Sequence, residues 1–326
     1  MTSKDSLSIT NIEGLGDRIR NSLSKAEIYS VKDLVVRGAM NVSEVKGIPI
    51  DHCNRICSKA RTKLDQLGIM NHPFTSEKYK EIERISLGSK TLDGLLGGRG
   101  LHIGAITEFF GESNSGKTQI CHTMCVMVQL DKDQGGLDGK AIYIDTESTF
   151  TQERIGPIAE ARGIDRNKAV NNIMIASPTS SSEQELYLER VGSIIDQHKN
   201  IKLLVVDSVT SLYRAEYIGR AALAERQQRL NRHMQMLRRI SEVYGVAVVV
   251  TNQVNEAPTD FTGYLRHKPI GGNVMAHAST CRIRLRQFGP HRVADLIHSP
   301  YLPEKHVYFG ISVQGFCDVP TPEPLK

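Results

Sequence analysis

The stretch Ala105-Ile-Thr-Glu-Phe-Phe-Gly-Glu-Ser-Asn-Ser-Gly-Lys-Thr118 joins an apolar run to a glycine-rich turn. The turn has the spacing Gly-x-x-x-x-Gly-Lys-Thr, in which backbone N–H groups curl around phosphate groups. A strand precedes this turn, and a helix is expected after it at Thr118–Gln129. This order predicts a nucleotide site in an α/β fold. The residues of this site are Gly111, Glu112, Ser113, Asn114, Ser115, Gly116, Lys117 and Thr118, followed by Gln119.

Polar groups also follow three other apolar runs, Ala141–Asp145, Lys202–Asp207 and Val246–Thr251. We expect Lys117 to reach the β- and γ-phosphates of ATP, and Thr118 and Asp207 to hold Mg²⁺. Glu147 follows the end of an expected strand, and a carboxylate in this position can deprotonate an attacking water. The amide of Gln253 can sense the γ-phosphate. The alternatives are a solvated loop acid for Glu147 and a loop cap for Gln253.

Strands alternate with helices from Ile85 onward, which predicts a mostly parallel, twisted sheet with helices on both faces. The expected strands also include Ile173–Ala176, and antiparallel strands follow from Arg282. Short helices are expected before this core. The chain therefore divides into a helical N-terminal domain (1–68), a linker (69–84), an ATPase core (85–318) and a tail (319–326).

Composition restricts the function only loosely. The 326 residues carry a formal charge of +5, which suits contact with phosphates without requiring it. Six cysteines, two pairs of them at helical spacing, indicate free thiols in a reducing compartment. The polar start and the lack of a long apolar run predict no secretory leader and no membrane span. We expect a cytoplasmic protein, or a nuclear one in a eukaryote.

Several motifs together strongly resemble the archaeal and eukaryotic branch of the RecA-like recombinases, its archaeal members most of all. The resemblance runs from about Asn11 to Asp318, and several of its motifs are specific to that branch. The motifs are Gly-Glu-x-x-x-Gly-Lys-Thr-Gln-Ile-Cys-His (111–122), Tyr-Ile-Asp-Thr-Glu (143–147), Leu-Ala-Glu-Arg-Gln-Gln (223–228), Thr-Asn-Gln-Val (251–254), Pro-Ile-Gly-Gly-Asn (269–273) and His-Ala-Ser-Thr (277–280).

The resemblance implies an ATP-dependent protein that polymerises on single-stranded DNA and pairs it with duplex DNA. It implies that Glu147 is the catalytic glutamate and Gln253 the γ-phosphate sensor. Arg154 would lie on the adenine, and Pro303 would cap the nucleotide of a neighbouring subunit. Partners would be DNA, further copies in a filament or ring, and mediator proteins.

Two segments, 214–223 and 255–276, match the DNA-facing loops of that family, and their composition suits the role. Basic side chains can contact the phosphate backbone, glycines allow close backbone approach, and aromatic rings can stack on bases. A flexible surface loop is the alternative interpretation. The candidate DNA-binding residues here are Arg214, Arg220, Phe261, Arg266, Lys268, Gly271 and Gly272.

The segment Ile12-Glu-Gly-Leu-Gly16 resembles a helix-hairpin-helix turn, in which Gly14 and Gly16 would offer backbone N–H groups to a DNA phosphate. A small helical bundle without DNA contact is the alternative. The helix expected at Ala222–Tyr244 carries a core stripe of Leu223, Leu230, Met234, Leu237 and Ile240. Its many arginines predict a solvated face.

Two departures from the family pattern bear on assembly. The linker has Phe74-Thr-Ser-Glu77 where the family has Phe-x-x-Ala, and a buried charge at Glu77 would be costly. His298 stands where the family has an aspartate near the neighbour's γ-phosphate. The main hypothesis is a strand-exchange ATPase; the alternatives are a mediator paralogue that binds ATP and DNA without exchanging strands, and a ring helicase with the same core fold.

Overall fold

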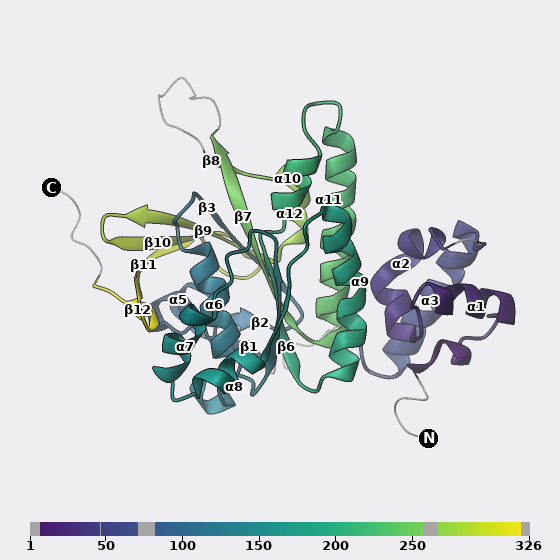
Figure 1. The fold of residues 1–326 in the computed structure, drawn as a ribbon, viewed down its shortest axis with the longest axis horizontal. Helices are drawn as coiled ribbons and strands as arrows, with labels where there is room; N and C mark the ends of the chain where they lie inside the picture. The colour runs from purple at the N-terminus through teal and green to yellow at the C-terminus, as the bar shows by residue number, and fades with distance from the viewer. Residues whose placement is uncertain (1–6, 46, 71–81, 257–266, 321–326) are drawn as a thin grey trace.

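The computed structural model describes residues 7–45, 47–70, 82–256 and 267–320. In this part of the chain, ten strands form one sheet in the order β12-β11-β10-β9-β3-β7-β6-β4-β5, with β8 paired to β7 (Figure 1). The strands are β3 Ile106–Gly111, β4 Lys140–Asp145, β5 Ile173–Ala176, β6 Ile201–Asp207, β7 Ala247–Glu256, β8 His267–Pro269, β9 Cys281–Phe288, β10 His291–His298, β11 Lys305–Ser312 and β12 Gly315–Asp318.

The central strands are parallel, and β9 to β12 continue the sheet as antiparallel pairs. The mostly parallel α/β sheet predicted from the sequence is therefore confirmed. A separate pair, β1 (Arg84–Ile85) and β2 (Leu101–His102), precedes it.

Helices cover both faces of the sheet, because the central strands are apolar on both sides. Along β6, Leu203 and Val205 pack into one core, whereas Leu204 and Val206 pack into the other. Alternate side chains of a strand point to opposite faces, so each core has its own set of helices. On one face lie α5 (Lys90–Leu95), α6 (Lys117–Met127), α7 (Gln152–Glu160) and α8 (Arg166–Asn171); on the other lie α9 (Ser181–Gln197), α11 (Leu223–Tyr244) and α12 (Gly272–Ala278), with α10 (Ser211–Glu216) beside them.

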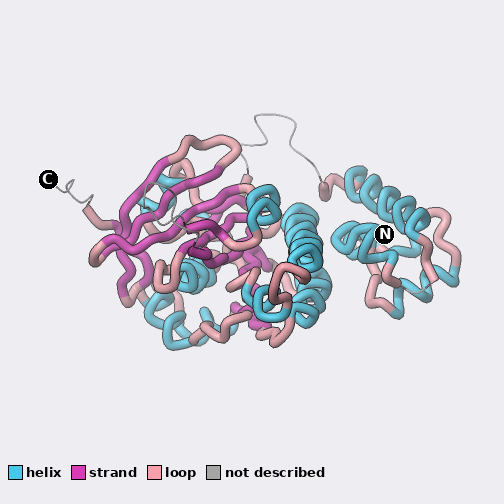
Figure 2. Tube along the Cα trace, turned by 90° about the horizontal axis from the view of Figure 1, so that it is seen from above, coloured by secondary structure: helices cyan, strands magenta, loops and turns pink. Residues whose placement is uncertain are grey.

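Three N-terminal helices lie beside α9 and α11, at the side of the core (Figures 1 and 2). They are α1 (Asp17–Lys25), α2 (Val31–Ser43) and α3 (Ile50–Gln66), after a short turn at Ile9–Asn11. Helix α2 makes the contact and α1 lies on the far side. None of the described helices is long and apolar enough to span a membrane.

Helix α11 departs from the sequence prediction in two ways. Four of the five stripe residues are buried, but Leu223, the first residue of the helix, is 42% exposed. The arginines do not all face solvent. Arg232 pairs with Glu44 of the N-terminal helices at 2.9 Å, and Arg239 lies against Gly38 of α2. This face binds the neighbouring helices because acidic residues and a glycine are placed opposite its guanidinium groups.

Candidate nucleotide and DNA site

The glycine-rich turn connects β3 to α6, as the motif requires. A Cβ atom on Gly111 would lie 2.1 Å from the carbonyl oxygen of Leu285, so that no side chain fits there. Gly116 directly precedes α6 with a φ of +106°, a conformation that favours glycine. The hydroxyl of Ser115 is buried in the turn without a hydrogen-bond partner. A phosphate oxygen would satisfy this hydroxyl, so the turn fits a nucleotide.

Lys117 lies at the mouth of the turn. Its Nζ donates to the carbonyl oxygens of Gly111 and Glu112, at 3.0 and 2.7 Å. Burial lowers the pKa of Lys117, while the carboxylates of Asp207 and Glu147 act in the opposite direction. An anionic phosphate is a stronger partner for an ammonium group than a neutral carbonyl, so this lysine is placed to exchange one for the other.

Asp207 lies at the end of β6, almost fully buried. One of its carboxylate oxygens accepts a hydrogen bond from Tyr143 at 2.7 Å, and the other accepts one from the hydroxyl of Thr251. These bonds fix the carboxylate close to the start of α6, where Thr118 lies one residue into the helix. Oxygen ligands of this kind suit Mg²⁺, which Thr118 and Asp207 would hold.

Glu147 and Gln253 meet although 106 residues separate them. The Gln253 side-chain amide donates to Glu147 Oε1 at 3.0 Å. The turn that carries Glu147 is shaped by Asp145, whose carboxylate accepts from the backbone N–H groups of Glu147, Thr149 and Phe150. Gln253 also accepts a hydrogen bond from Arg214 at 3.0 Å, so that the first predicted DNA segment contacts this pair directly.

Arg154 takes part in a different contact. Its guanidinium group donates to the carbonyl oxygens of Ser312 and Val313 and to Gln119. Arg162 donates to the carbonyl of Gln314 in the same turn. The two arginines thus hold the β11–β12 turn against the helices beside the phosphate-binding turn. This places Arg154 at the edge of the site through its contact with Gln119.

His298 and Pro303 lie at the other end of the sheet. His298 pairs with Arg282, which pairs with Glu108, three residues before Gly111 on β3. At about 3.3 Å per residue, His298 is therefore roughly 10 Å short of the phosphate-binding end. It lines a cavity of about 240 Å³ with His277 and Arg238. His298 thus lies away from the phosphate-binding turn of its own chain, and a role at ATP would require a second copy.

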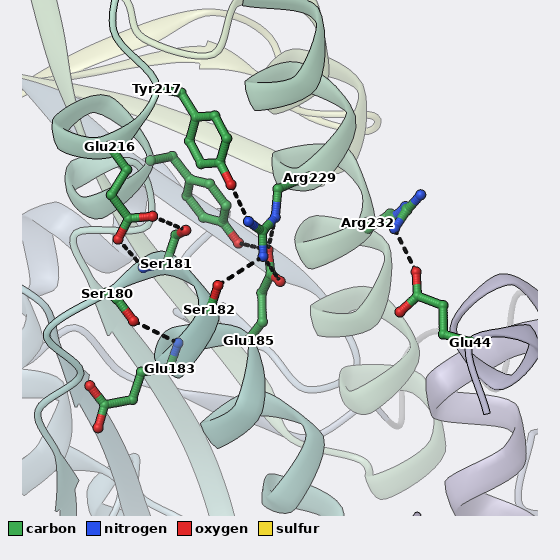
Figure 3. Close-up of polar contacts among 11 residues, drawn as sticks. Glu44, Ser180, Ser181, Ser182, Glu183, Glu185, Glu216, Tyr217, Arg229 and Arg232 are labelled. Atoms are coloured by element: carbon green, nitrogen blue, oxygen red, sulfur yellow. Dashed lines mark hydrogen bonds and ion pairs between the residues drawn. The ribbon is translucent and has the colours of Figure 1, made fainter. Parts of the chain in front are cut away.

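The first predicted DNA segment, residues 214–223, is held in place near its start by a polar network (Figure 3). Glu216 accepts from the backbone N–H of Ser181 at 2.6 Å, and also from the hydroxyl of that residue, at the start of α9. Tyr217 accepts from Arg229 of α11, which is paired with Glu185 of α9 at 2.6 Å. Beyond this network, Arg220 and Ile218 are exposed. The base of the segment is thus anchored and its tip faces solvent.

The described end of the second segment is β8 and the turn after it. Lys268 is exposed on β8. Gly271 and Gly272 both have positive φ, +82° and +50°, and a Cβ on Gly271 would meet Met275 at 2.6 Å. Phe261 and Arg266 lie outside the described residues, as do Phe74 and Glu77 of the linker.

The N-terminal turn with Gly14 and Gly16 is exposed, and Gly16 directly precedes α1 without a side-chain cap. Because both glycines are exposed, the N–H groups at the start of that helix are open to solvent.

The sequence interpretation missed a set of buried polar residues behind this site. Glu108 is fully buried in β3 and accepts from Arg282 at 2.6 Å and from Asn252 at 2.8 Å. The available signal was a glutamate within the apolar run Ile-Thr-Glu-Phe-Phe, since a buried charge requires a partner. The partner itself was not evident, because Arg282 is 174 residues away.

A parallel sheet, a glycine-rich turn at the end of β3 and acids at neighbouring strand ends define a phosphate-loop nucleotide-binding protein. The sequence pattern of the family described as Rad51 matches residues 78–319. The chain belongs to this family. It is 44% identical to the "DNA repair and recombination protein RadA" of Cenarchaeum symbiosum, over 99% of this chain and 81% of the relative. It is 40% identical to the protein of that name from Metallosphaera sedula, over 95% of both chains.

Proposed function

We propose that this chain is an ATP-dependent DNA recombinase, which assembles on single-stranded DNA and catalyses homologous pairing and strand exchange. The observation that carries the proposal is the line of contacts from Glu147 through Gln253 to Arg214. It joins a candidate base at the nucleotide to a segment with exposed basic residues. Family membership and the RadA relatives support the same function.

In this mechanism, the phosphate-binding turn and Lys117 hold the triphosphate. Thr118 and Asp207 would hold Mg²⁺, which would supply positive charge to neutralise the phosphates. Glu147 takes the proton of the attacking water. Gln253 holds Glu147 in place and responds to the γ-phosphate. Because Gln253 also contacts Arg214, occupation of the nucleotide site changes the position of the DNA segment. ATP binding thereby regulates the affinity for DNA, and hydrolysis loosens the assembly on DNA.

Assembly follows from the position of His298 and Pro303. His298 is displaced from the phosphate-binding end of the sheet, which supports a role for it and for the nearby Pro303 at the nucleotide of a neighbouring subunit. Copies arranged head to tail would form a filament or a ring. Basic and glycine-rich segments would contact both DNA strands, and Gly14 and Gly16 would contact duplex DNA. A protein with this function would be cytoplasmic and associated with the nucleoid.

The test measures ATP turnover with and without single-stranded DNA, for the parent and two variants. Glu147→Gln should retain nucleotide affinity and lose hydrolysis by roughly 10²–10⁴-fold, because the base is gone and the phosphate contacts remain. Lys117→Ala should weaken nucleotide binding itself. Unchanged turnover in Glu147→Gln would sink the assignment of the base.

Electron microscopy separates the recombinase from a mediator paralogue. With ATP, Mg²⁺ and single-stranded DNA, a recombinase should form extended helical filaments, and a strand-exchange assay should give paired product. Isolated particles that bind DNA without exchange would favour the mediator, whose case rests on the altered Phe74–Glu77 motif.

A further inference from the structure

A buried asparagine lies between the nucleotide site and both DNA segments. The side chain of Asn252 is fully buried in the middle of β7, directly before Gln253. Its oxygen accepts from the hydroxyl of Thr210 at 2.9 Å. Its nitrogen donates to the carbonyl oxygen of Ile270 and to Glu108, both at 2.8 Å. A side-chain amide with both its oxygen and its nitrogen bonded in this way is held in one orientation.

Each of these partners connects Asn252 to a strand or segment that takes part in the proposed function. Thr210 precedes α10, and its carbonyl oxygen accepts from the backbone N–H of Arg214 at 3.1 Å. Arg214 in turn donates to Gln253. Thr210, Asn252, Gln253 and Arg214 therefore form a closed ring of contacts around the base of the first DNA segment.

Ile270 is held from two sides. Its carbonyl oxygen accepts from Asn252, and its backbone N–H donates to the carbonyl oxygen of Gln253 at 3.0 Å. Gly271 and Gly272 follow it directly. A displacement of the backbone at Gln253 must therefore move Ile270 and the described end of the second DNA segment with it.

Glu108 holds the Asn252 side chain in a fixed position relative to β3. It lies on β3, three residues before Gly111, and its second oxygen is bound by Arg282 of β9. The Arg282 guanidinium group also lies over the ring of Phe110, 5.2 Å from its centroid. This ion pair is buried within the sheet, so it moves with the strand that carries the phosphate-binding turn. The Asn252 amide thus connects β3 to Thr210, which precedes the first segment, and to Ile270 of the second.

We propose that Asn252 is a positioning residue that transmits the state of the γ-phosphate site to both DNA segments, through Thr210 and Ile270. The inference rests on the proposed function, since it assumes that Gln253 senses the γ-phosphate. Asn252 does not touch nucleotide or DNA. It acts by keeping Gln253, Arg214 and Ile270 in one bonded unit.

The experiment uses the full chain and compares four proteins: the parent, Thr210→Val, Thr210→Ser and Asn252→Ala. Thr210→Val removes one hydroxyl and keeps the shape, whereas Thr210→Ser keeps the hydroxyl. Turnover is measured without DNA and with a single-stranded thymidine oligonucleotide. Affinity for that oligonucleotide is measured with ATP and with ADP.

Thr210→Val and Asn252→Ala should keep turnover without DNA, and its KM for ATP, within about twofold of the parent. The stimulation by DNA should fall by roughly tenfold, the size expected for losing a buried hydrogen bond. The difference in DNA affinity between ATP and ADP should shrink in the same variants. Thr210→Ser should behave as the parent does.

Two results would overturn the inference. One is an equal loss of turnover with and without DNA, which indicates a merely structural role. The other is unchanged stimulation in Thr210→Val. Asn252→Ala leaves Glu108 and Ile270 with unpaired polar groups. Should that variant fail to fold, the result for Thr210→Val decides the question. A parent protein without any DNA stimulation would contradict the proposed function instead, which keeps the two failures distinct.

Discussion

Two buried histidines of this chain are held in the neutral form. His233, on α11, lies against Gln184 of α9, and burial lowers its pKa to about 3. His122, on α6, packs between the rings of Tyr143 and Phe150, and burial lowers its pKa to about 4. Neither ring nitrogen of His122 has a hydrogen-bond partner, and Nδ1 of His233 has none either. Protonation of either ring would therefore place an uncompensated charge in the core.

Stability should consequently fall in mild acid. In the unfolded chain a histidine has a pKa near 6.5, so below that pH the unfolded state binds a proton that the folded state excludes. For His233 the free energy of unfolding should decrease by about 1.4 kcal/mol per pH unit between roughly pH 6 and pH 4. Urea unfolding of the parent and of His233→Gln across this range measures the slope. The variant should show a shallower decline, and parallel curves would contradict the prediction.

His298 gives a second prediction at the scale of one side chain. A family aspartate here would repel a neighbour's γ-phosphate unless a cation stood between them. An imidazole needs no such bridge, because it can donate a hydrogen bond directly. DNA-stimulated ATP turnover should therefore depend little on the type of monovalent cation. His298→Asp should create that dependence.

The measurement compares turnover in potassium, sodium and a bulky organic cation at matched ionic strength. His277 and Arg238, which line the same cavity, are present in both proteins. A parent that requires potassium as strongly as the aspartate variant would show that His298 does not replace the cation. A side chain that only faces solvent would leave the two proteins alike.

At the scale of elements, the two predicted DNA segments are anchored to the core in different ways, but each exposes a basic side chain. Arg220 lies beyond the anchor formed by Glu216 and Tyr217, and Lys268 lies on β8. Replacing both by alanine should reduce the salt dependence of single-stranded DNA binding, because each lost phosphate contact lowers the slope by about 0.7. ATP affinity without DNA should be unchanged.

Lys168 and Lys199 provide a matched control. Both are exposed lysines, in α8 and after α9, away from the two segments. Their double alanine variant removes the same charge and should keep the parent slope. Equal slopes for both double variants would show that the segments do not contact the phosphate backbone.

The elements themselves were largely predictable from the sequence. The strands were expected within about one residue of their observed starts, since apolar runs bounded by polar motifs are a strong signal. The end of β7 was not: the expected strand stopped at Thr251, whereas pairing continues to Glu256 because β8 returns alongside it. The meeting of Glu147 with Gln253 was expected only as proximity at one sheet edge. The hydrogen bond from Arg214 to Gln253 was not predicted, because it depends on the path of the chain between β6 and α10.

At the scale of the whole molecule, charged pairs hold the N-terminal helices against the core. Arg37 pairs with Glu189 at 2.8 Å, and Lys32 pairs with Asp196 at 3.2 Å. The sequence predicted the helices but not this contact. Charge patterns on separate helices do not state which pairs meet, and arginine-rich helices are more often solvated. Helix α2 makes this contact with the core, whereas the Gly14–Gly16 turn is exposed.

These contacts lead to a last prediction, that the N-terminal helices can be released by salt or by one substitution. Arg37 is only 11% exposed, so Arg37→Ala should cost more than the roughly 0.2–1 kcal/mol of an exposed pair. It also leaves the half-buried Glu189 unpaired, and burial already raises the pKa of that carboxyl. Hydrogen exchange of α2 should accelerate in Arg37→Ala. In the parent at about 1 M salt, where the screening length falls to about 3 Å, it should accelerate less, because partly buried pairs are screened less than exposed ones.

Arg238→Ala is the matched control, because Arg238 pairs with Glu242 within α11 itself. It should leave exchange in α2 unchanged. The released helices would carry their exposed turn over a wider range of positions, so duplex DNA affinity should change with α2 exchange if Gly14 and Gly16 bind phosphates. Equal exchange in Arg37→Ala, Arg238→Ala and the parent would show that apolar packing, rather than charge, holds α2 on the core.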